Sequence, residues 1–175
     1  MTTSARVVRP AQPGDVAAMR QIGADAGRRF ATVDDPRIAA CADDEPFEEH
    51  ELAAWIARDR AWVAVVDTVP VGFVVVDVVD GNAHIEEIAV DPRHGRSGHG
   101  QGLLDAVAAW AADHAYPAVT LTTFADVPWN RPWYERQGFH VLDPAEPGPE
   151  LAARVRVEEA EGLPADLRVC MGRTV

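Results

Sequence analysis

Lysine does not occur in this 175-residue sequence, so its 16 Lys-or-Arg side chains are all arginines, set against 28 aspartates and glutamates. The formal net charge of -12 argues against nucleic acid and anionic membrane as partners, since both are bound through basic faces. A P-loop is excluded as well, because its glycines are followed by Gly-Lys-Ser/Thr. This acidity is compatible with a cationic small molecule or peptide as the partner.

Cysteine is scarce too. Cys41 and Cys170 are too few for a disulfide scaffold and lack metal-ligand spacing, and the six histidines form no HxxxH pair. We therefore expect no metal and, as the simplest account, a cytoplasmic protein with reduced thiols. No apolar run approaches the roughly 20 residues that span a bilayer. The first twelve residues lack the apolar core of a signal peptide.

The sequence has enough apolar residues, 47%, to bury one core. No repeat or linker divides it, so we expect a single domain over residues 1–175. Runs rich in β-branched residues, separated by turns, predict strands at 5–9, 62–66, 71–79, 83–90, 118–124, 139–142 and 167–171. Helical spacing predicts helices from 16 onward and at 48–60, 103–115, 131–137 and 150–161, with a loop at 31–47. This order predicts an α/β (α+β) fold.

The most informative segment is residues 85–104, where an apolar strand with two carboxylates runs into a glycine-rich turn before a helix. The turn has glycines at positions 95, 98, 100 and 102 and basic side chains at Arg93, His94, Arg96 and His99. Backbone N–H groups at a helix N-terminus bind phosphate, and glycines allow a ligand to come close. The dinucleotide pattern GxGxxG fails, since position 103 is Leu103. A plain surface turn is the alternative interpretation.

The segment resembles the acetyl-CoA signature of the GNAT superfamily of N-acetyltransferases. That signature is a strand ending in V-x-P, then R/Q-x-x-G-x-G/A, then a helix beginning L-L. Here it corresponds to Val90-Asp91-Pro92, the turn from Gly95 to Gly100, and Leu103-Leu104. The arginine departs from the pattern by one place, at Arg96. A second block, Asn130 to Phe139, is similar to the family's N-x-x-x-Y-x-x-x-G-F, and DVPWNRPWYERQGF resembles a bacterial subgroup.

The resemblance implies a GNAT fold: a mixed, mostly antiparallel sheet of six to seven strands, splayed after the fourth and flanked by about four helices. It implies acetyl-CoA as co-substrate and direct transfer of its acetyl group to an amine. The pantetheine arm would be held by the main chain of Ile88, Ala89 and Val90 and by Asn130, which could equally cap the helix that follows. The pyrophosphate would be held by the turn residues Arg96, Ser97, Gly98, His99, Gly100 and Gln101.

Glu86 and Glu87 are the candidate bases. Side chains alternate along a strand, so we expect the two carboxylates to face opposite sides of the sheet. Burial in a central strand would raise the pKa of either one toward that of a useful base. The resemblance favours Glu87, three positions before the valine of V-x-P. The plain alternative is that both pair with arginines or face solvent.

Tyr134 is the candidate acid, because tyrosine keeps its proton at neutral pH and can pass it to a departing thiolate. In the family the matching tyrosine lies near the coenzyme A sulfur, so Tyr134 is also a cofactor-binding candidate. A core tyrosine with no chemical role is the alternative interpretation.

The acceptor is the open question. The resemblance places it near the first two helices, which assigns Phe30 and Glu86 to substrate binding. Acidic side chains from position 34 to 49 would favour a cationic amine, although such a run is usually a solvated loop. A small molecule, a peptide N-terminus and a protein lysine all stay open, as do homodimerisation and the role of residues 144–166. Two other functions are kept: a GNAT-fold sensor that binds acyl-CoA without turnover, and an acidic scaffold.

Overall fold

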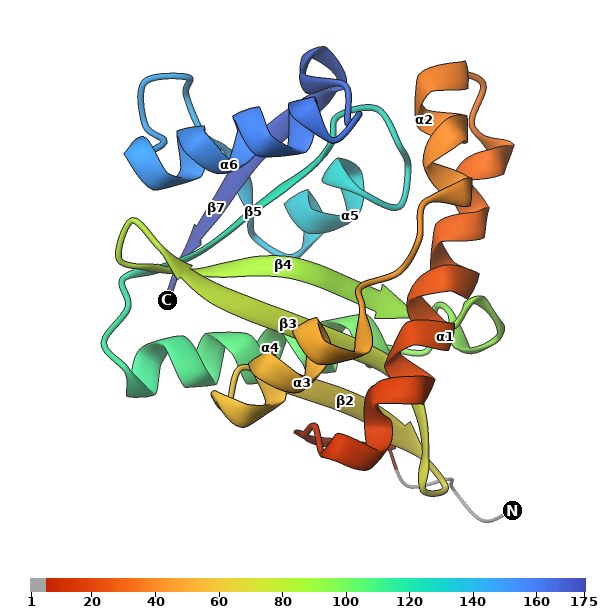
Figure 1. Cartoon of the computed structure of the whole chain (residues 1–175). Coiled ribbons are helices and arrows are strands. Elements are labelled where there is room, and N and C mark those ends of the chain that lie inside the picture. The colour runs from red at the N-terminus through yellow and green to blue at the C-terminus, as the bar shows by residue number, and fades with distance from the viewer. Residues whose placement is uncertain (1–5) are drawn as a thin grey trace.

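The computed structural model describes residues 6–175 and shows a seven-stranded sheet in the order β1-β2-β3-β4-β5-β7-β6 (Figure 1). The strands are β1 (Arg6–Pro10), β2 (Ala61–Val66), β3 (Val69–Val79), β4 (Asn82–Val90), β5 (Ala118–Phe124), β6 (His140–Val141) and β7 (Arg168–Thr174). Every neighbouring pair is antiparallel except β4 with β5. The predicted mixed, mostly antiparallel sheet is confirmed. The predicted start of the first strand, Ala5, lies outside the described residues.

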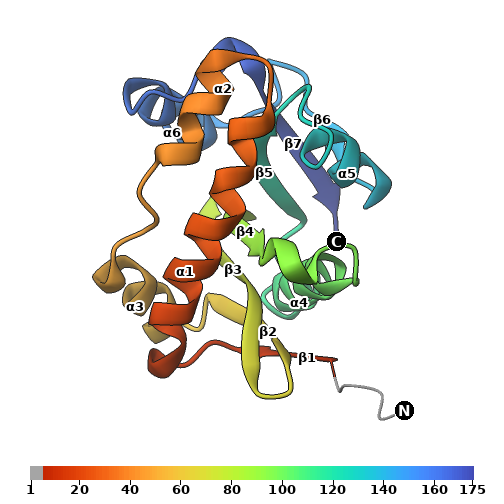
Figure 2. The same cartoon turned by 90° about the vertical axis from the view of Figure 1, so that its right-hand side faces the viewer.

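Helices cover both faces of the sheet. They are α1 (Val16–Gly27), α2 (Pro36–Ala40), α3 (Glu49–Ala57), α4 (His99–Asp113), α5 (Arg131–Arg136) and α6 (Pro149–Ala160). Four of them have nine residues or more, and α2 and α5 are short. Figure 2 shows α1, α3 and α6 on one face and α4 and α5 on the other. No helix within residues 6–175 has the length and apolar character needed to cross a membrane.

The core lies on both sides of β3, because successive side chains of a strand point to opposite faces. Val74 and Val76 pack against the α4 side, in a cluster that includes Leu103 and Val107. On the other side, Phe73 and Val75 pack in a cluster with Met19, Ile22 and Leu52 from α1 and α3. The central strands are thus packed on both faces, and this packing supports the side chains at the carboxyl end of β4.

The sheet opens between β4 and β5. These strands pair only over Ala83–Ile85 and Val119–Leu121, although β4 continues to Val90 and β5 to Phe124. Beyond Ile85 the two strands diverge, as the resemblance predicted for the fourth strand. The divergence leaves an opening between two central strands, bordered by the carboxyl end of each.

Residues 31–47 are not the simple loop that the sequence predicted, because α2 lies within them. The carboxylate of Asp35 accepts a hydrogen bond from the Arg37 N–H at 2.9 Å, and Pro36 occupies the first turn. An aspartate N-cap followed by proline is a recognised helix start. The helix has only five residues, too few to show the apolar spacing by which longer helices are detected.

The 144–166 segment contains α6, whose start is held by the turn between β3 and β4. Asp80 accepts hydrogen bonds from the N–H groups of Glu150 and Leu151, at 3.0 and 2.9 Å. A carboxylate at a helix N-terminus is favourable because it satisfies free N–H groups and opposes the helix dipole. The contact places α6 beside the opening between β4 and β5.

Candidate active site

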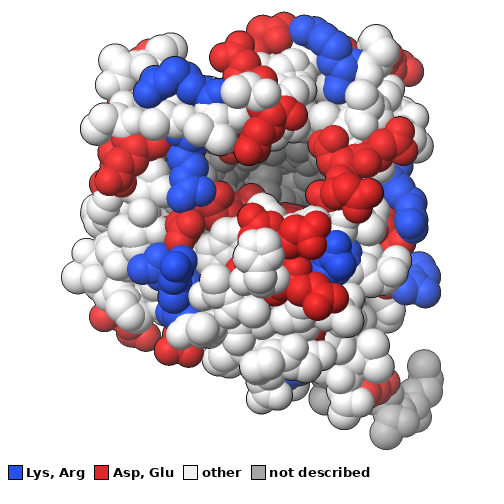
Figure 3. Space-filling model, in the orientation of Figure 1, with Lys and Arg blue, Asp and Glu red and all other residues white. Residues whose placement is uncertain are grey.

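A cavity of about 1640 Å³ lies where β4 and β5 part. Its walls come from the end of α1, the turn before α4, the start of α5 and one side of α6. Typical small-molecule sites have volumes of about 300–1,000 Å³, so this one has room for two reactants. Figure 3 shows the face with the hollow, and aspartates and glutamates border it on both sides.

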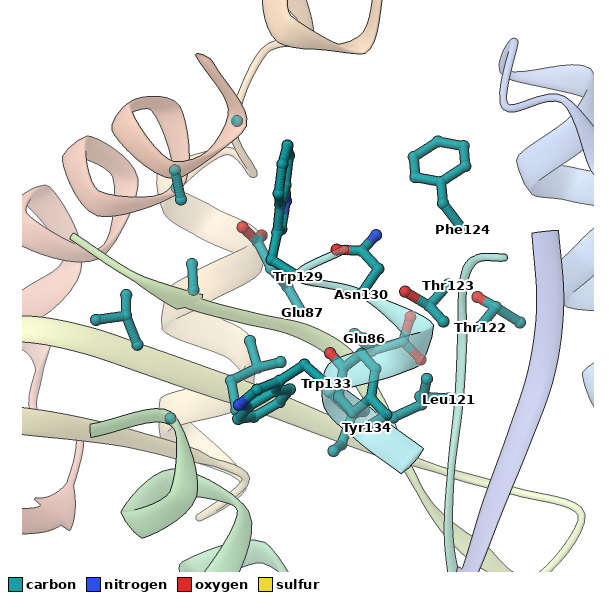
Figure 4. A pocket seen from close by; sticks show the side chains of 18 of the residues that line it. Glu86, Glu87, Leu121, Thr122, Thr123, Phe124, Trp129, Asn130, Trp133 and Tyr134 are labelled. Atoms are coloured by element: carbon teal, nitrogen blue, oxygen red, sulfur yellow. The ribbon is translucent and has the colours of Figure 1, made fainter. Parts of the chain in front are cut away.

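A bulge in β4 brings both candidate bases to one face, which corrects the prediction that they face opposite sides. Val75 pairs with Glu87 and Val76 pairs with Ile85, so Glu86 is one extra residue in β4. A bulge of this kind breaks the alternation of side chains along the strand. As a result both glutamates line the cavity (Figure 4). The sequence showed no glycine or proline that would have indicated the bulge.

Glu87 lies in the cavity without a cation. Within residues 6–175 no arginine or histidine nitrogen lies within 4.0 Å of its carboxylate. Burial alone raises the pKa of Glu87 to about 7. The side chain lies against α1 where Gly23 leaves space: a Cβ added at Gly23 would stand 3.2 Å from Glu87 Oε1. An unpaired carboxyl group with a pKa near neutrality has the properties of a general base.

Glu86 has a different environment, because Arg154 of α6 contacts it through an Nη1–Oε1 ion pair. The same guanidinium reaches Asp77 at 3.1 Å, and Arg60 reaches Asp77 at 3.1 Å. Burial raises the pKa of Glu86 to about 7, while the Arg154 charge opposes that rise. Glu86 is therefore tied into a chain of ion pairs that joins β4 and β3 to α6.

Tyr134 comes from α5 on the other side of the opening, and its hydroxyl points into the pocket (Figure 4). The ring is fixed edge-on by Trp133 and Phe139, with centroids 4.9 and 5.7 Å away. Burial raises the pKa of Tyr134 above its ordinary value, and the nearby Glu87 charge raises it further. The phenol therefore stays protonated over the whole physiological range, as an acid requires.

The glycine turn leads into α4 earlier than the sequence predicted. The helix begins at His99 instead of Leu103, and Gly98 immediately before it has a φ of 81° that favours glycine. A Cβ added at Gly100 would stand 3.1 Å from Trp133 Cζ2. The N–H groups of the first turn are left accessible at the cavity, which is the arrangement expected of an anion site.

The basic side chains of the turn are used unequally. Arg93 turns back onto Asp91, with Nη2 at 2.6 Å and Nε at 3.0 Å from the carboxylate oxygens, and it does not line the large cavity. The imidazole of His99 is buried. Arg96 lines the cavity and has a left-handed φ of 57°. The sequence placed Arg93 among the basic side chains of the turn, but its positive charge is neutralised by Asp91 within the turn and is not available to a ligand in the cavity.

The remaining candidates gather at the same cavity. Ten of the other predicted site residues line it, whereas Ser97 does not. The ten are Phe30, Ile88, Ala89, Val90, Gly98, His99, Gly100, Gln101, Asn130 and Tyr134. Asn130 precedes α5 but makes no side-chain capping bond, and it points into the pocket (Figure 4). The Phe30 ring packs edge-on against Phe124, and its centroid lies 6.1 Å from that of the Trp129 ring.

Sequence reasoning missed the polar group on the α6 side of the cavity. Arg168 donates hydrogen bonds to Thr122 Oγ1 at 2.8 Å and to Glu158 Oε2 at 3.1 Å, and it stacks on Phe124. These residues come from β7, β5 and α6, and no motif connects them. Among residues 6–175, no cluster of three or more His, Cys, Asp or Glu side chains has an arrangement that would hold a metal.

The comparisons agree with this geometry. The model of the acetyltransferase (GNAT) family matches residues 20–139, and the chain belongs to that family. Its fold is similar to that of PaiA N-acetyltransferase from Thermoplasma acidophilum, solved in complex with coenzyme A. The TM-score is 0.71 at 13% identity, covering 98% of this chain and 99% of that one.

Two further solved structures share the fold. One is the ribosomal-protein-S18-alanine N-acetyltransferase from Escherichia coli, with a TM-score of 0.68, 17% identity, and coverage of 98% of this chain and 94% of that one. The other is N-acetylglutamate synthase from Neisseria gonorrhoeae, complexed with coenzyme A and N-acetyl-glutamate. It has a TM-score of 0.71, 15% identity, and coverage of 99% of this chain and 36% of that one. Their names indicate different acceptors, so the likeness concerns the fold alone.

Proposed function

We propose that this protein transfers the acetyl group of acetyl-CoA to an amine, with Glu87 as the base and Tyr134 as the acid. The observation that carries the proposal is the opening between β4 and β5. A carboxyl group with a raised pKa borders it on one side, and a protonated phenol borders it on the other. Membership of the acetyltransferase (GNAT) family supports the class of reaction.

The residues present fit acetyl-CoA. The opening after Ile85 leaves the β4 edge at Ile88, Ala89 and Val90 free of β5, so its amides can bind the pantetheine arm as a neighbouring strand would. The turn before α4 offers backbone N–H groups to the pyrophosphate, and a side chain at Gly100 would contact Trp133 tightly, with its Cβ 3.1 Å from Cζ2. Acetyl-CoA supplies the thioester; the protein supplies position, a proton acceptor and a proton donor.

Glu87 would accept the proton that the amine loses, directly or through one water. Its environment suits this role because no arginine or histidine among residues 6–175 pairs with the carboxylate, and burial keeps its pKa near neutrality. Tyr134 would donate a proton to the departing sulfur. No covalent step on the protein is required, and burial raises the pKa of both Cys41 and Cys170, which makes these thiols poor nucleophiles.

We propose a cationic amine as the acceptor. Asp44, Glu45 and Glu51 line the cavity from the α3 side, and Glu161, directly after α6, lines it from the α6 side. Acidic groups on two sides of one mouth raise the local concentration of cations. The two arginines on the α6 side, Arg154 and Arg168, are paired with carboxylates and do not reverse this charge.

A thiol-release assay with acetyl-CoA and a panel of amines tests the proposal. The panel should contain polyamines, amino-acid amides, peptides with free N-termini and lysine peptides, with Glu87→Gln as the inactive control. We expect turnover with at least one cationic amine and little with amines that carry a free carboxylate. Acetyl-CoA binding without turnover across the panel would favour the sensor, and absence of binding would exclude both functions.

A further inference from the structure

The arginines of the cavity fall into two groups. Five arginines line it: Arg29, Arg96, Arg136, Arg154 and Arg168. The last two, beside α6, are paired with Glu86, Asp77 and Glu158. The first three have no carboxylate within 4.0 Å among residues 6–175. In a chain with 28 acidic residues, three unpaired arginines around one cavity indicate a site for a ligand that brings its own negative charge.

Arg29 belongs to an element that the resemblance assigned to the acceptor. It lies in the 3-10 turn Arg28–Thr32, directly after α1. Its guanidinium carbon stands 4.3 Å above the ring of Trp129, which precedes α5. Stacking on an aromatic face fixes the plane of a guanidinium and leaves the N–H groups at its edge free to bond. Arg29 therefore reaches from the α1 side of the cavity toward the α5 side.

Arg96 approaches the same space from the turn before α4. The two guanidinium groups are close enough to repel each other: burial, and then the Arg96 charge, lower the pKa of Arg29. Two positive charges this close to each other are unfavourable unless an anion lies between them. The backbone N–H groups at the start of α4 border the same side of the cavity. Arg29 thus adds a side-chain donor to the side-chain and main-chain donors of the turn.

We propose that Arg29, together with Arg96, binds the phosphate groups of the cofactor. The proposal rests on acetyl-CoA as the co-substrate. The shared ligand chemistry is a phosphoester dianion or pyrophosphate, and coenzyme A carries both, as a 3′-phosphate and a pyrophosphate.

The test compares Arg29→Ala with the unchanged protein on three donors. For acetyl-CoA, losing one charge-assisted contact should raise Kd and KM about tenfold or more. For S-acetyl-pantetheine, which has no phosphodiester or pyrophosphate, the two proteins should agree within about twofold. With 3′-dephospho-acetyl-CoA, a persisting loss assigns Arg29 to the pyrophosphate, and a vanishing loss assigns it to the 3′-phosphate. Arg29→Lys should recover part of the affinity, because it restores the charge.

Arg58→Ala is the matched control. Arg58 is exposed, lies at the end of α3 and does not line the cavity, so the same change in net charge should leave all three donors unaffected. Equal acetyl-CoA affinity in Arg29→Ala and the unchanged protein would overturn the proposal, and so would an equal loss with S-acetyl-pantetheine. Failure of the proposed function would be seen differently, as absence of turnover with every amine, or of coenzyme A binding, in the unchanged protein.

Discussion

The two sides of the β4 bulge differ more than their sequence suggests. Glu86 and Glu87 are adjacent, line one cavity and both have a pKa raised to about 7. On the Glu86 side, Arg154 from α6 forms ion pairs with both the Glu86 carboxylate and Asp77. On the Glu87 side, no cation of residues 6–175 is in contact, and the protonated phenol of Tyr134 is near enough for the Glu87 charge to raise its pKa.

The difference separates two uses of a buried carboxylate. A paired carboxylate contributes to structure and costs stability when its partner is removed. An unpaired one is unfavourable for folding, since its ionisation in a poorly solvated site is penalised, but it can take up a proton at neutral pH. We therefore assign the proton transfer to Glu87 and the anchoring of α6 to Glu86.

The largest effect should come from Glu87→Gln, which keeps the shape and removes the charge. We expect kcat/KM for the amine to fall about 10²-fold or more, because general-base contributions are worth about 10²–10⁴. Acetyl-CoA affinity should stay nearly unchanged. Steady-state kinetics together with calorimetric titration of acetyl-CoA measure both quantities.

Glu86→Gln is the comparison variant, and its loss should be clearly smaller. If the two variants lost equally little, a chain of water molecules would serve as the base with no dedicated carboxylate. If kcat/KM fell further in Glu86→Gln than in Glu87→Gln, Glu86 would have to be assigned as the base and Glu87 as the structural carboxylate.

Tyr134→Phe should have the next largest effect. It removes one oxygen and keeps the edge-on packing with Phe139. If the hydroxyl protonates the departing sulfur, kcat should fall about 10-fold or more, with little change in the KM for acetyl-CoA. A residue with a packing role alone would leave kcat per folded molecule unchanged and lower the thermal midpoint. Both should be measured on the same preparation.

The smallest effect concerns stability. Because the pKa of Glu87 is raised from 4.5 to about 7 on folding, its contribution is favourable below about pH 4.5 and is lost as the pH rises to about 7. Glu87→Gln should therefore be more stable than the unchanged protein above pH 7, by on the order of 3 kcal/mol. This gain in unfolding free energy should disappear below pH 4.5. Denaturant unfolding of both proteins, once above pH 7 and once below pH 4.5, measures it.

Glu86 and Glu87 have the same raised pKa, about 7, so ionisation alone predicts equal gains for the two variants above pH 7. Glu86→Gln should nevertheless gain less stability, because removing its carboxylate leaves Arg154 with Asp77 as its remaining partner in the ion-pair chain. A larger gain for Glu86→Gln than for Glu87→Gln would contradict the contrast between the paired and unpaired sides.

Much of the fold could be predicted from the sequence because its signals are local. The β-branched runs and short turns that gave the predicted strands at 62–66, 71–79 and 83–90 correspond to β2, β3 and β4. The glycine turn and the block from Asn130 to Phe139 gave the family. Strand alternation failed at Glu86, because the bulge depends on how β3 and β4 pair and leaves no mark in either strand alone.

The rest of the site depends on contacts between distant segments. Arg154 meets Glu86 across 68 positions of the chain, and Arg29 meets the Trp129 ring across 100. No spacing rule connects such pairs. The neutralisation of Arg93 could have been predicted from the sequence, because Asp91 lies two positions before it. An aspartate that accepts hydrogen bonds from nearby N–H groups is a common turn arrangement.

The pH dependence of kcat/KM, measured with one amine for the unchanged protein, Glu87→Gln and Glu86→Gln, tests the central claim most directly. The amine's own ionisation is common to all three. The unchanged protein and Glu86→Gln should both lose rate below an inflection near pH 7, where Glu87 takes up its proton. Glu87→Gln should lack that inflection. An inflection that persists in Glu87→Gln, or that disappears in Glu86→Gln, would contradict the assignment of Glu87 as the base.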